Sequence, residues 1–74
     1  MSQEQKEKIK RSLDCALRNL DEDPELSAYI LREICKGVEE LSEWVELCHD
    51  FQRFGVHKND LRPIIEEIKK YIED

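Results

Sequence analysis

The sequence predicts an all-α protein, and three observations support that prediction. Apolar residues recur at the three- and four-residue steps of an α-helix over most of the chain. Capping residues, prolines and glycines divide the chain into segments at helix ends. No segment alternates apolar and polar residues for long, as a half-buried strand would. Because 74 residues have room for only one core, we expect residues 1–74 to form a single helical domain.

A first helix is expected over about residues 3–20. Ser2 and Gln5 have the spacing of a capping box, in which each side chain satisfies a backbone N–H at the helix start. Its apolar residues follow steps of four, three and four and so share one face: Ile9, Leu13, Ala16 and Leu20, with Leu17 beside them. Pro24 ends this helix nearby, because proline disfavours helical backbone in the residue before it.

A second, long helix is expected over residues 24–54. Asp23 can cap it, and Pro24 suits the first helical position because that position needs no N–H donor. Its apolar residues alternate steps of three and four for about two and a half heptads: Leu31, Ile34, Val38, Leu41, Val45 and Cys48. This seam predicts that the helix is the central element of the fold.

Gly37 offers an alternative to one continuous helix. The sequence Lys36, Gly37, Val38 can end a helix if glycine takes the left-handed conformation and an apolar residue follows it. Against a break, the heptad phase crosses Gly37 unchanged, and no Ser, Thr, Asp or Asn stands directly after it as a new cap. We expect continuity, which makes the helix roughly 45 Å long. The alternative is a compact four-helix monomer broken at Gly37.

A third helix is expected after a loop that begins at Gly55. Asn59 or Asp60 can cap it, and Pro63 falls in its first turn, where proline removes no intrahelical bond. Its predicted buried face consists of Leu61, Ile64, Ile65, Ile68, Tyr71 and Ile72. Short connections make both outer helices antiparallel to the long central helix.

The predicted long helix carries a second apolar stripe that we expect to form a homodimer interface. The stripe consists of Trp44, Leu47, Phe51 and Phe54. One long helix covered by two short ones would leave it partly exposed, and large apolar patches usually mark interfaces. A dimer would then complete a helical bundle. In the four-helix alternative, the same side chains are buried within one chain.

An acidic face is also expected on this helix, formed by Glu39, Glu43, Glu46 and Asp50. These residues follow steps of four, three and four, and no Lys or Arg interrupts residues 37–52. Such a face can dock a basic protein partner or imitate a phosphate backbone, although a solvated helix surface is the simpler interpretation. The net charge of −6 argues against a nucleic acid or an anionic membrane as the partner.

The sequence contains no motif for catalysis or cofactor binding. Cys48, His49, Asp50 and His57 include the right elements for zinc, but adjacent helical positions point about 100° apart, so we expect no metal site. The three cysteines, Cys15, Cys35 and Cys48, are expected to be reduced, buried thiols. No apolar run suits a signal peptide or a membrane span, which predicts a cytosolic protein.

These features favour a small acidic module, such as an adaptor, regulator or inhibitor, that binds another protein and catalyses no reaction. One alternative is a DNA-binding regulator, because residues 51–70 have the outline of a helix-turn-helix, with Gly55 in the turn. Pro63 within its second helix and the acidic Glu66 and Glu67 depart from that pattern. A third possibility is an acidic nucleic-acid mimic or antitoxin-like inhibitor.

Overall fold

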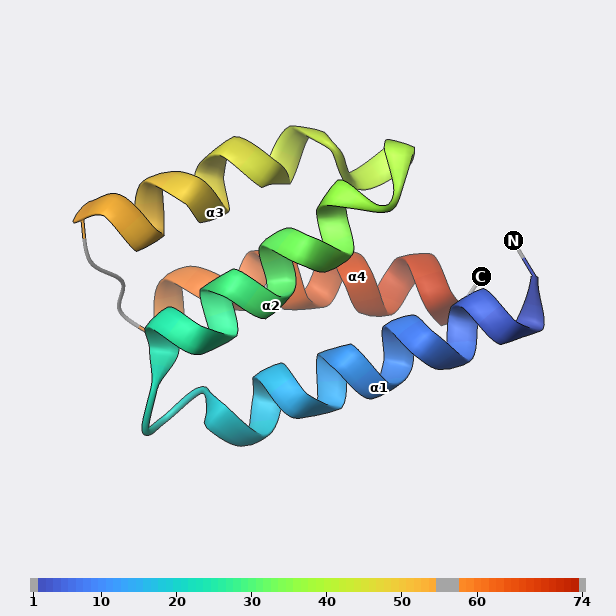
Figure 1. Cartoon of the computed structure of the whole chain (residues 1–74), viewed down its shortest axis with the longest axis horizontal. Helices are drawn as coiled ribbons and strands as arrows, with labels where there is room; N and C mark the ends of the chain where they lie inside the picture. Colours follow the sequence, from blue (N-terminus) through green and yellow to red (C-terminus); the bar gives the residue numbers. More distant parts are fainter. Residues whose placement is uncertain (1, 55–57, 74) are drawn as a thin grey trace.

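The computed structural model describes residues 2–54 and 58–73, and within these it describes the side chains of residues 2–51 and 59–73. Its helices are α1 (Gln3–Asn19), α2 (Pro24–Lys36), α3 (Glu43–Phe54) and α4 (Arg62–Glu73) (Figure 1). Two short 3₁₀ turns, η1 (Glu39–Leu41) and η2 (Lys58–Leu61), precede α3 and α4. All regular structure in the described residues is helical, which confirms the predicted all-α class.

The starts of α1 and α2 are those that the sequence predicts. The Ser2 hydroxyl accepts a hydrogen bond from the Gln5 backbone N–H at 3.2 Å. The Asp23 carboxylate accepts one from the Leu26 N–H at 3.1 Å, and Pro24 is the first residue of α2. Each cap satisfies one of the backbone donors that a helix start leaves without an intrahelical partner.

The prediction of one continuous helix over residues 24–54 is wrong, because α2 ends at Lys36 and the chain folds back. The Gly37 N–H donates to the carbonyls of Glu33 and Ile34, at 3.3 and 3.2 Å. Gly37 has φ −86° and ψ −2°, so it closes the helix without entering the left-handed region. Val38 then leaves the helix in an extended conformation, with φ −128° and ψ 115°.

Apolar side chains are buried on both sides of the reversal. Val38, between α2 and η1, Leu41 on η1 and Cys48 on α3 all enter the core. Their heptad spacing did not reveal the break, because these positions are buried whether the helix continues or folds back. The turn η1 leads into α3 through a hydrogen bond from the Val45 N–H to the Ser42 carbonyl at 3.2 Å. Because the next α-helix begins only at Glu43, it needs no capping residue directly after Gly37.

The helices form a compact bundle with α2 at its centre. α1 and α3 pack on α2 from different sides, and α4 lies against both α1 and α2 (Figure 1). The bundle measures 34 × 23 × 15 Å, so its longest dimension is shorter than the expected central helix. Its buried apolar side chains are Ile9, Leu13, Ala16, Ala28, Leu31, Ile34, Cys35, Val38, Leu41, Cys48, Leu61, Ile64, Ile65 and Ile68. This bundle has the four helices and the break at Gly37 that the alternative prediction contains.

The predicted C-terminal helix forms, but it begins at Arg62, after the turn η2, and not directly after Asn59 or Asp60. Pro63 is the second residue of α4, and the 3₁₀ turn η2 leads into it. In that turn, the Asn59 side-chain oxygen accepts a hydrogen bond from Arg62 Nε at 3.2 Å. Of the predicted buried face, Tyr71 and Ile72 are only partly buried and pack at the edge of the core.

Candidate functional site

The approach of α1 to α2 is closest near the connection that joins them. Ala16 on α1 and Ser27 and Ala28 on α2 are fully buried there. The Ser27 hydroxyl donates a hydrogen bond to the Ala16 carbonyl at 2.6 Å. Small side chains allow two helices to pack closely, whereas farther from this connection the ribbons of α1 and α2 draw apart (Figure 1). The candidate site is a groove between these two helices.

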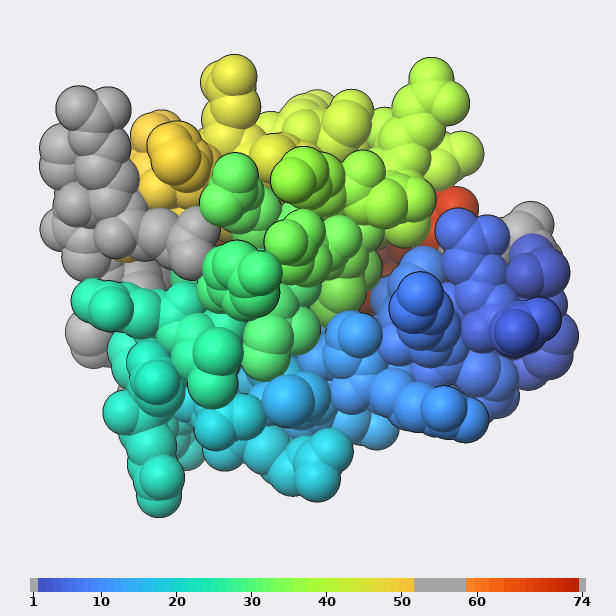
Figure 2. Space-filling view, viewed as in Figure 1, coloured from blue at the N-terminus to red at the C-terminus, as the bar shows by residue number. Residues whose placement is uncertain are grey.

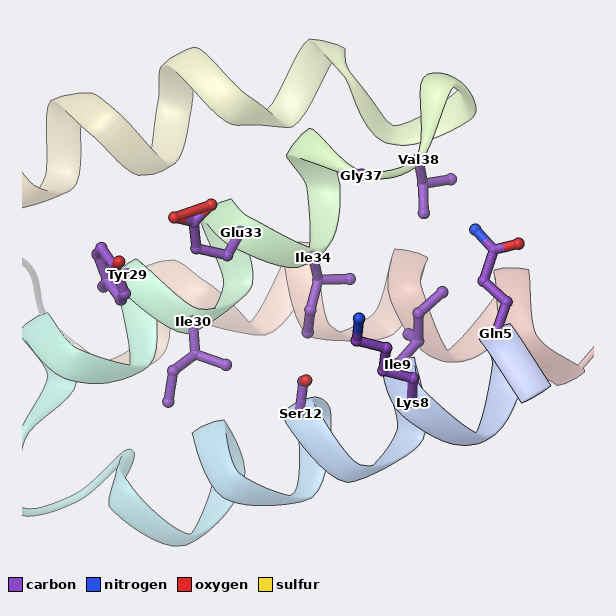
Figure 3. Close-up of a pocket in the computed structure, with 10 residues that line it drawn as sticks. All are labelled: Gln5, Lys8, Ile9, Ser12, Tyr29, Ile30, Glu33, Ile34, Gly37 and Val38. Carbon is purple, nitrogen blue, oxygen red and sulfur yellow. The ribbon is translucent and has the colours of Figure 1, made fainter.

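An open groove of about 440 Å³ lies between the first half of α1 and the second half of α2. Ile30 and Ile34 point from α2 toward α1, and Val38 lies at the end of the groove (Figure 3). The remaining lining residues are Gln5, Lys8, Ile9, Ser12, Tyr29, Glu33 and Gly37. In the space-filling view, the surface is hollowed between α1 and α2 (Figure 2). The groove is thus apolar inside, with polar side chains around it.

Exposed apolar surface continues from the groove along α2. Tyr29, which lines the groove, is 47% exposed, and Leu26 is 40% exposed. The two residues are three positions apart, so they lie on the same side of the helix. Charged residues flank the groove, with Lys8 on α1 and Glu33 on α2. The site therefore offers an apolar strip with opposite charges on its two sides.

The groove was not predicted from the sequence. Only one apolar seam was assigned to the segment that forms α2, although Leu26, Tyr29 and Ile30 lie outside that seam. Apolar residues on more than one side of a helix indicate that it packs against more than one neighbour or presents a surface. These three residues were the feature of the sequence that could have indicated a second apolar surface on this helix. The separation of α1 and α2 that opens the groove cannot be read from such a pattern.

The predicted homodimer interface does not form one exposed stripe in the residues that the structure describes. Trp44 and Phe51 are partly buried and pack against the core of their own chain. Leu47 is 37% exposed. The side chain of Phe54 lies outside the described residues. Burial of Trp44 and Phe51 within the chain is what the four-helix alternative predicts.

The predicted acidic face is exposed but divided between two elements. Glu39 lies on η1, whereas Glu43, Glu46 and Asp50 lie on α3 at helical steps of three and four. All four side chains are exposed. The acidic residues of α3 therefore retain the shared face expected from their spacing, and the fold-back at Gly37 separates Glu39 from it.

Two of the three cysteines meet in the core. Cys35 of α2 and Cys48 of α3 are fully buried, and their thiols interact through a hydrogen bond. That hydrogen bond, together with burial and the charge of Cys48, raises the pKa of the Cys35 thiol. The same hydrogen bond lowers the pKa of Cys48 against the opposing effect of burial, and the positive charge of Arg32 lowers it further. The expectation that Cys15 is buried is wrong, because its side chain is exposed.

The candidate residues for zinc or DNA binding belong to α3, to α4 and to the segment of sequence between them. His49 is exposed, and His57, like Gly55, lies outside the described residues. Within the part of the chain that the structure describes, no three Cys, His, Asp or Glu side chains gather in a geometry suited to a metal ion. On α4, Lys69 forms an ion pair with Glu66 at 3.9 Å. That contact reduces the positive charge available for a phosphate backbone.

Comparison of the chain with protein-family models, with curated proteins and with solved structures finds no match. Among the described helices, none combines the length and the apolar content needed to cross a membrane. The geometry of the groove and of its surroundings therefore carries the functional argument.

Proposed function

We propose that the protein is a small helical module that binds a partner protein by surface docking and catalyses no reaction. The observation that supports this proposal is the apolar groove between α1 and α2, continued by the exposed Leu26 and Tyr29. Grooves of this kind accept the apolar face of an amphipathic helix, whose side chains at helical spacing enter the groove one after another. As part of the proposal, the module works in the cytoplasm, where free thiols persist.

The expected occupant is one amphipathic helix of the partner, with basic residues beside its apolar face. Glu33 flanks the groove on α2, opposite Lys8 on α1, and the exposed Glu43, Glu46 and Asp50 add negative charge on α3, which packs on another side of α2. The chain as a whole carries a net charge of −6. Attraction between opposite charges increases the association rate and selects against acidic partners.

A second copy of this chain fits the groove less well than a different, basic protein. Two copies that each carry a charge of −6 repel one another, and Trp44 and Phe51 already pack on their own core. Among the side chains that the structure describes, the large apolar ones left exposed for homodimerisation are Leu26, Tyr29 and Leu47. The nucleic-acid mimic or antitoxin-like inhibitor differs from our proposal only in the identity of the basic partner.

An NMR titration with synthetic peptides tests the proposal. Isotope-labelled protein is titrated with an amphipathic helix of Leu and Lys, and separately with one of the same length made of Leu and Glu. We expect the basic peptide to shift the amide signals of Ile9, Ile30 and Ile34 more than signals elsewhere, because these residues line the groove. The acidic peptide should leave them nearly unchanged because of charge repulsion.

Two matched variants separate groove binding from general charge attraction. Ser12→Arg places a long side chain in the groove, whereas Gln3→Arg adds the same charge on α1 outside it. We expect Ser12→Arg to weaken binding of the basic peptide and Gln3→Arg to weaken it much less. Equal effects of the two variants, or shifts confined to the acidic residues of α3, would contradict docking in the groove.

A further inference from the structure

Cys35 and Cys48 are brought together by the fold-back of the chain and are not part of the groove. They lie on different helices, α2 and α3, and each is fully buried. Their thiols are within hydrogen-bonding reach of one another across the interface of these helices. A disulfide bond is about 2.05 Å long, so the two sulfurs must approach one another from hydrogen-bonding distance to form one.

We propose that Cys35 and Cys48 are a site of reversible oxidation, at which an intramolecular disulfide bond joins α2 to α3. The oxidant is a hydroperoxide such as hydrogen peroxide. Cytoplasmic disulfides in most organisms are transient and respond to oxidants, which fits a pair of reduced thiols that are held in contact.

The reaction proceeds in two steps that balance. The Cys48 sulfur attacks one peroxide oxygen, the O–O bond breaks, and water leaves with formation of a sulfenic acid on Cys48. The Cys35 sulfur then attacks the Cys48 sulfur, the S–O bond breaks, and a second water leaves. Two thiols lose two electrons and two protons, and one peroxide is reduced to two waters.

Cys48 is the better first nucleophile of the pair. The hydrogen bond from Cys35 and the positive charge of Arg32 favour its thiolate, and the thiolate is the reactive form of cysteine. Peroxide is a small molecule and reaches the buried sulfur through small fluctuations at the interface of α3 with α2, which leave Cys48 beside Cys35 and Arg32.

The disulfide bond would stabilise the folded-back arrangement. It closes the short loop from residue 35 to residue 48, which contains Gly37 and the turn η1. Closing a loop of this size increases the folding equilibrium constant roughly a hundredfold, because it restricts the unfolded chain. The oxidised protein should therefore unfold at a higher urea concentration than the reduced protein.

Mass spectrometry of the full chain tests the proposal. Cys15→Ser removes the exposed thiol, which would otherwise link two copies. Trypsin places the other two cysteines on separate peptides, residues 33–36 and 37–53, because it cleaves after Arg32, Lys36 and Arg53. After peroxide treatment under native conditions, we expect the intact mass to fall by two hydrogens and these two peptides to be linked. Dithiothreitol should reverse both changes.

Single variants show whether both thiols are needed. In the Cys15→Ser background, Cys35→Ala and Cys48→Ala should each lose the two-hydrogen change. If either variant fails to fold, the linked peptides of the Cys15→Ser protein still identify the bond. Oxygen addition without a link, a disulfide bond between two copies, or a link that forms only in urea would overturn the proposal.

Discussion

The hydroxyl of Ser27 sets the geometry at the closed end of the groove. It donates to the carbonyl of Ala16 at 2.6 Å, and Ala16 lies in the last turn of α1. The final carbonyls of a helix lack intrahelical partners, so this hydrogen bond satisfies one of them while it joins two helices. A buried polar side chain thus fixes where α1 and α2 touch, and the groove opens beyond that point.

We predict that Ser27→Ala lowers the free energy of unfolding by about 1 kcal/mol, because it removes a buried hydrogen bond. Urea unfolding monitored by circular dichroism provides the measurement. Ser12→Ala, the same substitution in the interior of α1, is the control and should not lower the midpoint. An unchanged midpoint for Ser27→Ala would show that the contact between α1 and α2 does not depend on this hydroxyl.

Tyr71, at the other end of the molecule from Ser27, makes a pH-dependent contribution to the free energy of unfolding. Partial burial and the negative charge of Glu40 raise the pKa of Tyr71, as does its hydrogen bond to the Glu40 carboxylate. The folded state therefore holds the phenol proton more tightly than the unfolded state does. This contribution is fully present below the unfolded pKa of about 10 and is lost as the pH rises through the folded value.

Tyr71→Phe removes the hydrogen bond to Glu40 and should therefore be less stable than the unmodified protein at neutral pH, and the difference should shrink above about pH 10, where the phenol ionises. Thermal midpoints measured from pH 7 to pH 11 test this expectation. Tyr29→Phe makes the same chemical change at a tyrosine that is 47% exposed. If the thermal midpoints of both variants depend on pH in the same way, the contact between Tyr71 and Glu40 does not contribute to the pH dependence of stability.

At the scale of helices, local signals predicted the boundaries well except at Gly37. Ser2, Asp23, Pro24 and Pro63 act where the sequence places them, because caps and prolines depend on neighbouring residues only. The end of α2 depends instead on burial of side chains far along the chain. A heptad pattern records which side chains are buried, and it does not record whether their partner is another chain or the same one.

Gly37→Ala should be tolerated or should stabilise the protein by up to about 1 kcal/mol, because alanine restricts the unfolded chain. A β-carbon at this position would lie 3.7 Å from the Ile34 carbonyl oxygen and 3.8 Å from that of Glu33, which are ordinary contacts. Gly37→Pro, in contrast, removes the N–H that donates to both carbonyls and should destabilise the fold. Urea unfolding of both variants provides the comparison. If alanine destabilised the protein as much as proline, the conformation of Gly37 would not be the right-handed one.

At the scale of the whole molecule, the acidic residues were predicted correctly as surface residues, whereas the groove was not predicted. Exposure of Glu43, Glu46 and Asp50 follows from helical spacing and charge, which the sequence contains directly. The groove depends on the angle between α1 and α2. That angle results from contacts such as the one between Ser27 and Ala16, which join residues eleven positions apart.

The compact bundle predicts a single chain in solution when no partner is present. Sedimentation equilibrium at high micromolar concentration should give the mass of one chain, 8.9 kDa. We expect a single chain because the core packs within one chain and because two copies of charge −6 repel one another. A dimer mass that Leu47→Glu returned to that of one chain would instead support the homodimer that the sequence suggests.

The most direct test of the folded-back chain, on which the groove and the thiol pair both depend, is an NMR distance measurement. In one continuous helix, Cys35 and Cys48 would be roughly 20 Å apart along the axis. In the bundle their thiols are in contact, so we predict a nuclear Overhauser effect between their β-protons. Isotope-filtered spectra of mixed labelled and unlabelled protein should show that it arises within one chain. Absence of this effect, or its appearance only between chains, would contradict the folded-back bundle.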